Sequence, residues 1–309
     1  MENEYWLRMS DDADIYVKKW FEPNRKPKAI LQLAHGMVEH IERYNDFASF
    51  LIKHDIFVYG NDHRGHGKTG ERQGLLGFLA EKDGFQIVTE DLFEVTKKIK
   101  SDFPNIPVFM LGHSMGSFLG RNYIQSHSNE IDGILLSGTG YFPKIKTFTG
   151  KQLSSLFPPR NPNTLMNFLT YFSYNKKIGN RKTTLDWLTS NEKAVQDYMN
   201  DPYCGFVPTA RFFYDLMSGI INIQDSNRIE TIRKDLPLLL ISGDMDPVGD
   251  YTKGVWKTAK LYEKAGMEKI MIHIFTDGRH ELLNETYKDE VYHSIYNWIV
   301  NEINRKSSE

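Results

Sequence analysis

The sequence predicts an α/β protein in which a mostly parallel central sheet carries helices on both faces and an inserted helical cap interrupts the chain. Short apolar runs typical of buried parallel strands alternate with helical patterns over residues 1–140 and again over 235–309. Residues 141–234 contain helical patterns broken by prolines, but no such run. We therefore expect a core formed by the two outer segments, 1–140 and 235–309, and a cap at 141–234.

The expected core elements follow from local patterns. Residues 5–21 alternate around an acidic turn, which predicts an antiparallel hairpin at a sheet edge. Residues 61–70 are rich in glycine and are expected to form a loop. Buried strands are expected at 29–34, 56–60, 108–111, 131–137, 236–242 and 270–275, and helices at 44–54, 85–100, 254–264, 285–304 and directly after residue 114. In such a sheet, the ligand site lies beyond the carboxyl ends of the strands.

Composition excludes several classes of protein. The 309 residues are 40% hydrophobic and 25% charged, and 38 basic side chains balance 40 acidic ones, so no nucleic-acid partner is expected. The N-terminus lacks the plan of a signal peptide, and no apolar run is long enough to span a bilayer. The single cysteine, Cys204, excludes an internal disulfide and fits a reducing compartment, so we expect a cytoplasmic protein. No motif surrounds Cys204, which is expected to be inert.

Ser114 is the candidate nucleophile. It lies at the centre of a G-x-S-x-G motif that directly follows a buried strand and precedes a helical pattern. A side chain at the tip of such a turn takes a strained backbone conformation, and Gly112 and Gly116 remove the β-carbons that would collide there. The motif alone arises by chance in roughly one chain in ten of this length. The strand before it and the helix after it favour the catalytic interpretation.

His280 is the candidate general base. A serine hydroxyl is a poor nucleophile until a base removes its proton, and that base needs an acid to hold its tautomer. His280 follows the strand at 270–275, at the edge of the sheet where the chemistry is expected. Competing histidines lie within or near the ends of predicted elements: His54, His127, His273 and His293.

Asp246 is the candidate acid of the triad. It follows the strand at 236–242, and Gly243 allows the loop to bend back over the sheet. Asp244 and Asp250 are nearby alternatives that could instead cap a turn. The loop at 138–140 contains no carboxylate, which removes the other plausible place for an acid.

Met37 and Met115 are the candidate oxyanion donors. Acyl transfer needs two N–H groups aimed at the developing oxyanion, one from the residue after the nucleophile and one from the loop after an earlier strand. Met115 and Met37 occupy these positions, and both would act through the backbone, so their side chains are expected to line the pocket.

Two further motifs are assigned no role in binding. Residues 67–69, Gly-Lys-Thr, mimic the end of a phosphate-binding loop, but Asp62 stands where its charge would repel phosphate. Asp62, His63 and His66 include metal-ligand types, but no further ligand lies nearby, and a hydrogen-bonded loop is the favoured interpretation. We expect neither a metal nor a cofactor.

Together these motifs resemble the monoacylglycerol lipase and lysophospholipase branch of the α/β-hydrolases. The resemblance rests on residues 35–40 with Arg43 and Tyr44, on 62–67, 112–116, 243–248 and 280–285. It implies the α/β-hydrolase fold, a triad of Ser114, Asp246 and His280, and no cofactor. It also implies a small acyl ester of glycerol or of a lysophospholipid as substrate. Residues 37–38, Met-Val, replace the smaller residues of many relatives, which bears on substrate choice.

Alternatives remain open at this point. Other acyl chemistries on the same fold are a thioesterase, a perhydrolase and a peptidase acting at short N-termini, which would need an acidic pocket for the amine. A non-catalytic binding protein is a further alternative. Between residues 141 and 175 aromatic side chains exceed the chain's 13%. They form either an apolar lid that touches membranes or micelles, or the core of a small helical subdomain.

Overall fold

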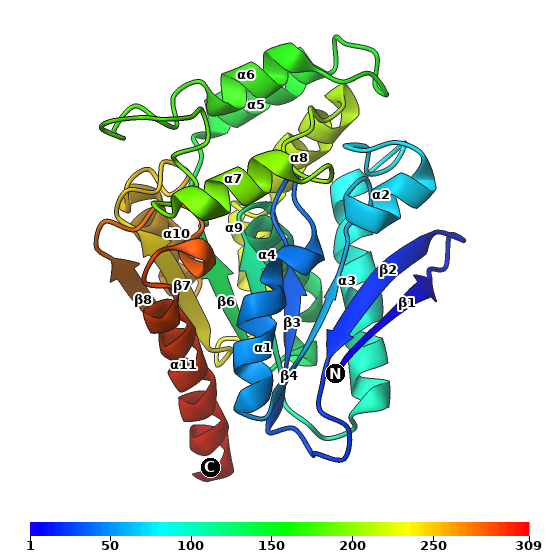
Figure 1. Cartoon of the computed structure of the whole chain (residues 1–309), viewed down its shortest axis with the longest axis vertical. Helices are drawn as coiled ribbons and strands as arrows, with labels where there is room; N and C mark the ends of the chain where they lie inside the picture. The colour runs from blue at the N-terminus through cyan, green and yellow to red at the C-terminus, as the bar shows by residue number, and fades with distance from the viewer. Residues whose placement is uncertain (309) are drawn as a thin grey trace.

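Residues 1–308 of the computed structural model are described here, with side chains through Arg305, and they form one eight-stranded sheet with helices on both faces (Figure 1). The strands are β1 (Glu2–Arg8), β2 (Asp14–Trp20), β3 (Ala29–Ala34), β4 (Ile56–Asn61), β5 (Val108–His113), β6 (Gly133–Ser137), β7 (Leu238–Gly243) and β8 (Ile270–Phe275). Their order across the sheet is β1-β2-β4-β3-β5-β6-β7-β8. β1 and β2 run antiparallel, and the strands from β4 to β8 in this order are parallel. The predicted fold class and edge hairpin are therefore confirmed.

The helices of the core cover two apolar layers. Side chains of a strand alternate between the faces of the sheet, so Met110 lies in one layer and Leu111 in the other. The first layer is covered by α3 (Gly84–Asp102), α4 (Met115–His127) and α10 (Lys253–Lys264). The second is covered by α1 (Asn45–Lys53) and α11 (Lys288–Ser308), on the near side of the sheet in Figure 1. Short 3₁₀ helices complete the core: η1 (Ile41–Tyr44), η2 (Ser128–Glu130) and η3 (Leu282–Asn284).

The main difference from the prediction lies at residues 61–70. The expected loop at 61–70 is a helix from Gly67 onward, α2 (Gly67–Gln73). The reason is long-range, because the buried carboxylate of Asp62 accepts hydrogen bonds from the N–H of Lys68 at 2.7 Å and the N–H of Ile41 at 2.9 Å. This carboxylate occupies the helix N-terminus, where the amides are otherwise unpaired. The final helix also differs, since it begins at Lys288 rather than at residue 285.

Helices fill the chain between β6 and β7. They are α5 (Lys144–Ser154), α6 (Thr164–Tyr171), α7 (Glu192–Asn200), α8 (Ala210–Asn222) and α9 (Ser226–Glu230). The last four begin at side-chain N-caps: Asn163, Asn191, Thr209 and Asp225. Figure 1 shows α5, α6 and α7 above the carboxyl ends of the parallel strands. The division into a core and a cap at 141–234 stays a prediction. Within this segment α8 packs on α3 and α4, and its Phe212 and Phe213 are buried.

None of the helices within residues 1–308 has the length and apolar character required to cross a bilayer.

Candidate active site

Ser114 lies on a strained turn between β5 and α4. Its φ of 52° is in the left-handed region, which costs a non-glycine residue about 1–3 kcal/mol. Close packing enforces the turn, because a β-carbon at Gly116 would lie 2.0 Å from the carbonyl oxygen of Ala34, and one at Gly112 would lie 2.3 Å from the oxygen of Gly116. The N–H of Ser114 donates to the oxygen of Ser137 at 2.9 Å, which anchors the turn to β6. Its side chain thus projects beyond the strand ends.

His280 and Asp246 meet through a buried hydrogen bond. The distance from Nδ1 of His280 to Oδ1 of Asp246 is 3.0 Å, and the side chains are 2% and 0% exposed. The same oxygen accepts the N–H of Val248 at 2.9 Å, which fixes the carboxylate. Burial lowers the pKa of His280, but the charge and hydrogen bond of Asp246 outweigh it, so the pKa lies above its ordinary value of 6.5. The structure pairs His280 with Asp246 rather than with Asp244 or Asp250.

The imidazole of His280 packs against the strand ends that carry Ser114. Its ring centroid lies 4.8 Å from that of His113, the residue before Ser114. A β-carbon at Gly138 would lie 2.8 Å from Cε1 of His280, so the ring lies directly over the end of β6. On the other side lies Trp187, between α6 and α7, whose ring centroid is 5.0 Å from that of His280. The backbone oxygen of Trp187 accepts the backbone N–H of His280 at 3.3 Å. The imidazole of His280 is thus packed between the ends of β5 and β6 on one side and the indole of Trp187 on the other.

The loop after β3 lies beside Ser114. A β-carbon at Gly36 would lie 3.2 Å from Cβ of Ser114, so the two backbones are close neighbours. Within residues 1–308, the backbone N–H of Met37 donates to no backbone oxygen, and Met115 is the first residue of α4, where the N–H groups have no partner within the helix. Buried or half-buried N–H groups are rarely left unpaired. Two unpaired donors next to Ser114 are therefore available to a ligand.

Comparison with known proteins identifies the family. A family model described as serine aminopeptidase, S33, matches residues 25–287. The chain belongs to this family. It is similar to monoglyceride lipase of Rattus norvegicus, with 27% identity over 95% of this chain and 89% of the relative. Monoacylglycerol lipase of Mycolicibacterium smegmatis is 25% identical over 91% of each chain.

One solved structure has the same fold as this chain. A highly thermostable carboxyl esterase from Bacillus coagulans, crystallised in complex with glycerol, superposes with a TM-score of 0.90. It shares 29% identity over 98% of this chain and 99% of its own. The resemblance deduced from the motifs is therefore confirmed.

An ion-pair network in this family member joins the loop of Met37 to the residue after His280. Both carboxylate oxygens of Glu281 accept from Arg43 at 2.7 Å, and Glu39 accepts from the same guanidinium at 2.5 Å. The other oxygen of Glu39 accepts from the N–H of Gly36 at 2.5 Å. Burial raises the pKa of Glu281, but Arg43 more than compensates and holds it at about 2. Sequence reasoning gave these residues no role, because their pairing spans most of the chain.

The other histidines of this hydrolase have structural contacts. His54, His127, His273 and His293 lie within or at the ends of helices and strands, as predicted. The rings of His35 and His63 pack at 4.0 Å, and Nε2 of His35 accepts the N–H of His63 at 3.0 Å. Burial lowers the pKa of His63 to about 3 and that of His66 to about 4, so both are neutral near pH 7. These rings connect loops beneath the site.

The side chains that could share a metal ion are not Asp62, His63 and His66, the group considered from the sequence. Among the described residues, His40, Asp201 and Cys204 have ligand atoms within 4.8 Å of one another. Asp62 instead binds backbone N–H groups, and His63 and His66 contact backbone oxygens at 3.1 Å and 2.9 Å.

Proposed function

We propose that this carboxylic ester hydrolase cleaves esters of the monoacylglycerol or lysophospholipid type through Ser114, His280 and Asp246. The observation that carries the proposal is the buried bond between Nδ1 of His280 and Oδ1 of Asp246, next to a strained turn that presents Ser114. The names of the relatives, monoglyceride lipase and monoacylglycerol lipase, support this class of substrate.

The proposed mechanism is acyl transfer in two halves. Nε2 of His280 takes the proton of Ser114 as its oxygen attacks the ester carbonyl, and Asp246 stabilises the imidazolium. The N–H groups of Met37 and Met115 stabilise the oxyanion, with each such donor contributing about 2.7–4 kcal/mol in related chemistry. His280 then protonates the leaving alcohol, and water attacks the acyl-enzyme by the reverse route.

Peptidase action is a weaker alternative, although the family model carries an aminopeptidase description. A peptidase that acts at N-termini needs a free carboxylate for the substrate's amine. The buried carboxylates beside the loop of Met37, Glu39 and Glu281, both already bind Arg43. Asp246 is likewise engaged with His280 and Val248. These carboxylates are therefore not free to bind a substrate amine, which favours an ester over a peptide N-terminus.

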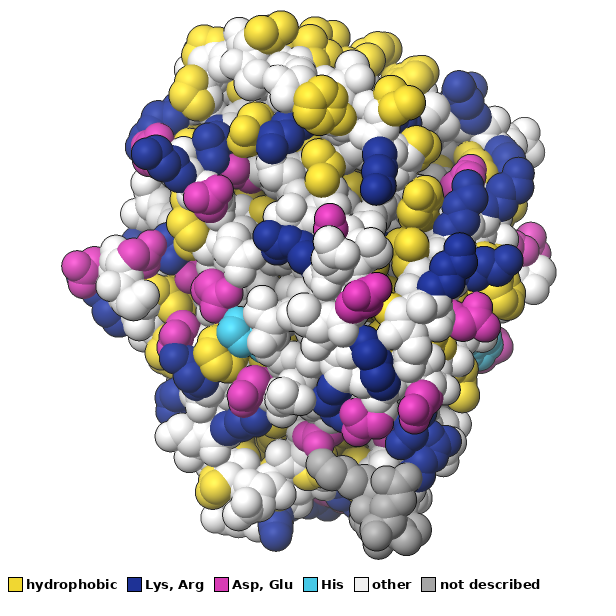
Figure 2. Space-filling view, turned by 180° about the vertical axis from the view of Figure 1, so that it is seen from behind, with side chains coloured by type: hydrophobic (Ala, Val, Ile, Leu, Met, Phe, Trp, Pro, Cys, Tyr) yellow, Lys and Arg dark blue, Asp and Glu magenta, His cyan; other side chains and the backbone are white. Residues whose placement is uncertain are grey.

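We also propose that α5 and α6 rest on lipid aggregates. Large apolar side chains on and between these helices are 44–83% exposed: Ile145, Phe148, Leu156, Leu165, Phe168 and, just after α6, Phe172. Figure 2 shows hydrophobic side chains gathered at the cap end of the molecule, with Lys and Arg side chains below them. A contiguous exposed apolar surface favours a lipid or protein contact. Other aromatic residues of this segment, Tyr171 and Tyr174, instead pack against Trp187.

The decisive experiment measures hydrolysis of monoacylglycerols and lysophospholipids of graded chain length by the unaltered chain and by Ser114→Ala. We expect Ser114→Ala to lose at least about 10³-fold in kcat while its circular dichroism spectrum is retained. A fluorophosphonate probe should label the unaltered chain at Ser114. Unchanged turnover by the variant would contradict the mechanism, and activity on peptides alone would contradict the substrate class.

A further inference from the structure

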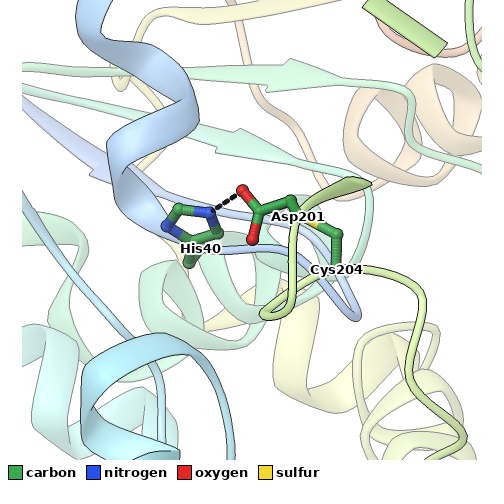
Figure 3. Close-up of side chains that lie close together, drawn as sticks. All are labelled: His40, Asp201 and Cys204. Carbon is green, nitrogen blue, oxygen red and sulfur yellow. Dashed lines mark hydrogen bonds and ion pairs between the residues drawn. The ribbon is translucent and has the colours of Figure 1, made fainter. Parts of the chain in front are cut away.

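Three side chains with different ligand atoms meet where the loop after β3, residues 35–40 and here called the core loop, touches the segment after α7 (Figure 3). His40 comes from the loop that carries Met37, whereas Asp201 and Cys204 lie in one turn closed by the N–H of Cys204 on the oxygen of Asp201 at 3.0 Å. Nε2 of His40 lies 2.8 Å from Oδ2 of Asp201. The three ligand atoms all lie within 4.8 Å of one another.

The chemistry of this group suits a borderline-soft divalent cation. Zinc binds imidazole nitrogen, carboxylate oxygen and thiolate sulfur, and bond lengths of about 2.0–2.3 Å place tetrahedral ligand atoms roughly 3.3–3.8 Å apart. The widest observed separation, at most 4.8 Å, is up to about 1 Å longer than this, so the side chains must move closer together on binding. His40 is buried, while the side chain of Asp201 is 26% exposed, so solvent can supply a fourth ligand. The other oxygen of Asp201 accepts the N–H of Tyr203 at 2.8 Å, which orients the carboxylate.

We propose that His40, Asp201 and Cys204 form a binding site for a zinc-class divalent cation that bridges the core loop and the segment after α7. On binding, the thiol proton of Cys204 passes to solvent and the sulfur coordinates the metal as thiolate. Neighbouring bonds already join the same two segments, because the oxygen of Val38 accepts from Gly205 at 3.0 Å and from the hydroxyl of Tyr198 at 2.9 Å. A bound cation would therefore strengthen an existing contact next to Met37.

The test is a titration of the full chain, without a histidine tag, with Co²⁺ followed by absorption spectroscopy. Cobalt bound to a cysteine thiolate gives a sulfur-to-metal charge-transfer band in the near ultraviolet. We expect this band in the unaltered chain, its removal by Zn²⁺ competition, and its loss in Cys204→Ser. Asp201→Asn and His40→Asn should weaken binding at least about tenfold. Zn²⁺ should also raise the Tm of the unaltered chain, since it binds the folded state.

Matched variants separate this site from other ligands. Ser114→Ala removes the proposed nucleophile and His127→Asn removes a histidine paired with Glu90, so both should keep the band. Failure of the esterase proposal would leave these spectra unchanged, because they do not depend on turnover. No charge-transfer band with Co²⁺, or a band that persists in Cys204→Ser, would overturn the metal site. If Cys204→Ser does not fold, weaker Co²⁺ binding in Asp201→Asn but not in His127→Asn supports the site, and equal binding in both variants overturns it.

Discussion

Arg43 binds Glu281 through two parallel hydrogen bonds of 2.7 Å, across 238 positions of the chain. Both side chains are nearly buried, at 11% and 5% exposure, and Glu39 shares the same guanidinium. Arg43 thereby connects the loop of Met37 to the residue that follows His280. Its guanidinium also lies 4.8 Å from the ring centroid of Tyr198 on α7.

Arg43→Met is expected to destabilise the fold by about 3–5 kcal/mol, because it leaves two buried carboxylates without a counter-ion. It should also lower kcat more than it raises KM, since it releases both loops of the site. Arg43→Lys keeps the charge but loses the two-point geometry, and should recover part of the stability and less of the activity. Urea unfolding and steady-state kinetics measure both effects. An unchanged unfolding midpoint in Arg43→Met would contradict the role given to this network.

Asp246→Asn is expected to reduce kcat by roughly 10⁴-fold, as the equivalent change does in serine proteases. The pH profile provides a second readout. The active form needs neutral His280, so activity rises with pH through its pKa, which Asp246 holds above 6.5. Removing that charge lowers the pKa, and the acidic limb of kcat/KM should move to lower pH. Asp250→Asn is the matched control, since Asp250 is exposed and asparagine tolerates its φ of 48°, and the limb should stay in place.

Gly138→Ala is expected to impair activity through the position of His280. The new β-carbon would lie 2.8 Å from Cε1 of that ring, and the φ of 62° adds strain of about 1–2 kcal/mol. Gly74→Ala is the control, because its φ of 74° carries similar strain but no atom lies within 4 Å of the new β-carbon. We expect both variants to lose stability from the strained φ, and only Gly138→Ala to lose kcat. Equal activity in the two variants would show that His280 does not need this contact.

Phe168→Asp with Ile145→Asp should weaken binding to phospholipid vesicles. These side chains are 62% and 83% exposed, and each buried large apolar side chain contributes about 1.5–3 kcal/mol, so a loss of about tenfold or more is expected. Activity on a short, water-soluble ester should not change. Trp256→Asp is the control, because Trp256 is 53% exposed but lies on α10. Vesicle co-sedimentation measures the effect, and equal loss in the control would indicate nonspecific adhesion.

Stability should fall as the pH drops below 6.5. His66 has a pKa of about 4 in the folded state, so between pH 6.5 and 4 the unfolded chain binds its proton and the folded chain does not. At pH 5 this difference lowers the free energy of unfolding by about 2 kcal/mol, relative to pH 7, for one such histidine. His66→Gln should therefore flatten the decline in Tm between pH 7 and 5. His293→Gln, which changes an exposed histidine on α11, should leave the slope unaltered.

The sequence by itself determined the strands, the edge hairpin and the resemblance to α/β-hydrolases, because these follow from short local patterns along the chain. It missed α2, since this helix depends on Asp62 rather than on an apolar face. It also placed Ser114 and His280 at the same edge of the sheet, because parallel strands put their carboxyl ends together. The glycine before it favoured Asp246 over Asp244 and Asp250 as the acid beside His280, and the structure shows that the side chains of His280 and Asp246 are hydrogen-bonded.

Only the tertiary structure decided which distant side chains meet. The bond of His280 to Asp246, the pair of Arg43 with Glu281 and the approach of His40 to Cys204 depend on how loops pack. The same holds for the exposure of Phe168 and the burial of His66. Charge pairs and burial are set by long-range packing, and periodicity along the chain carries no information about either.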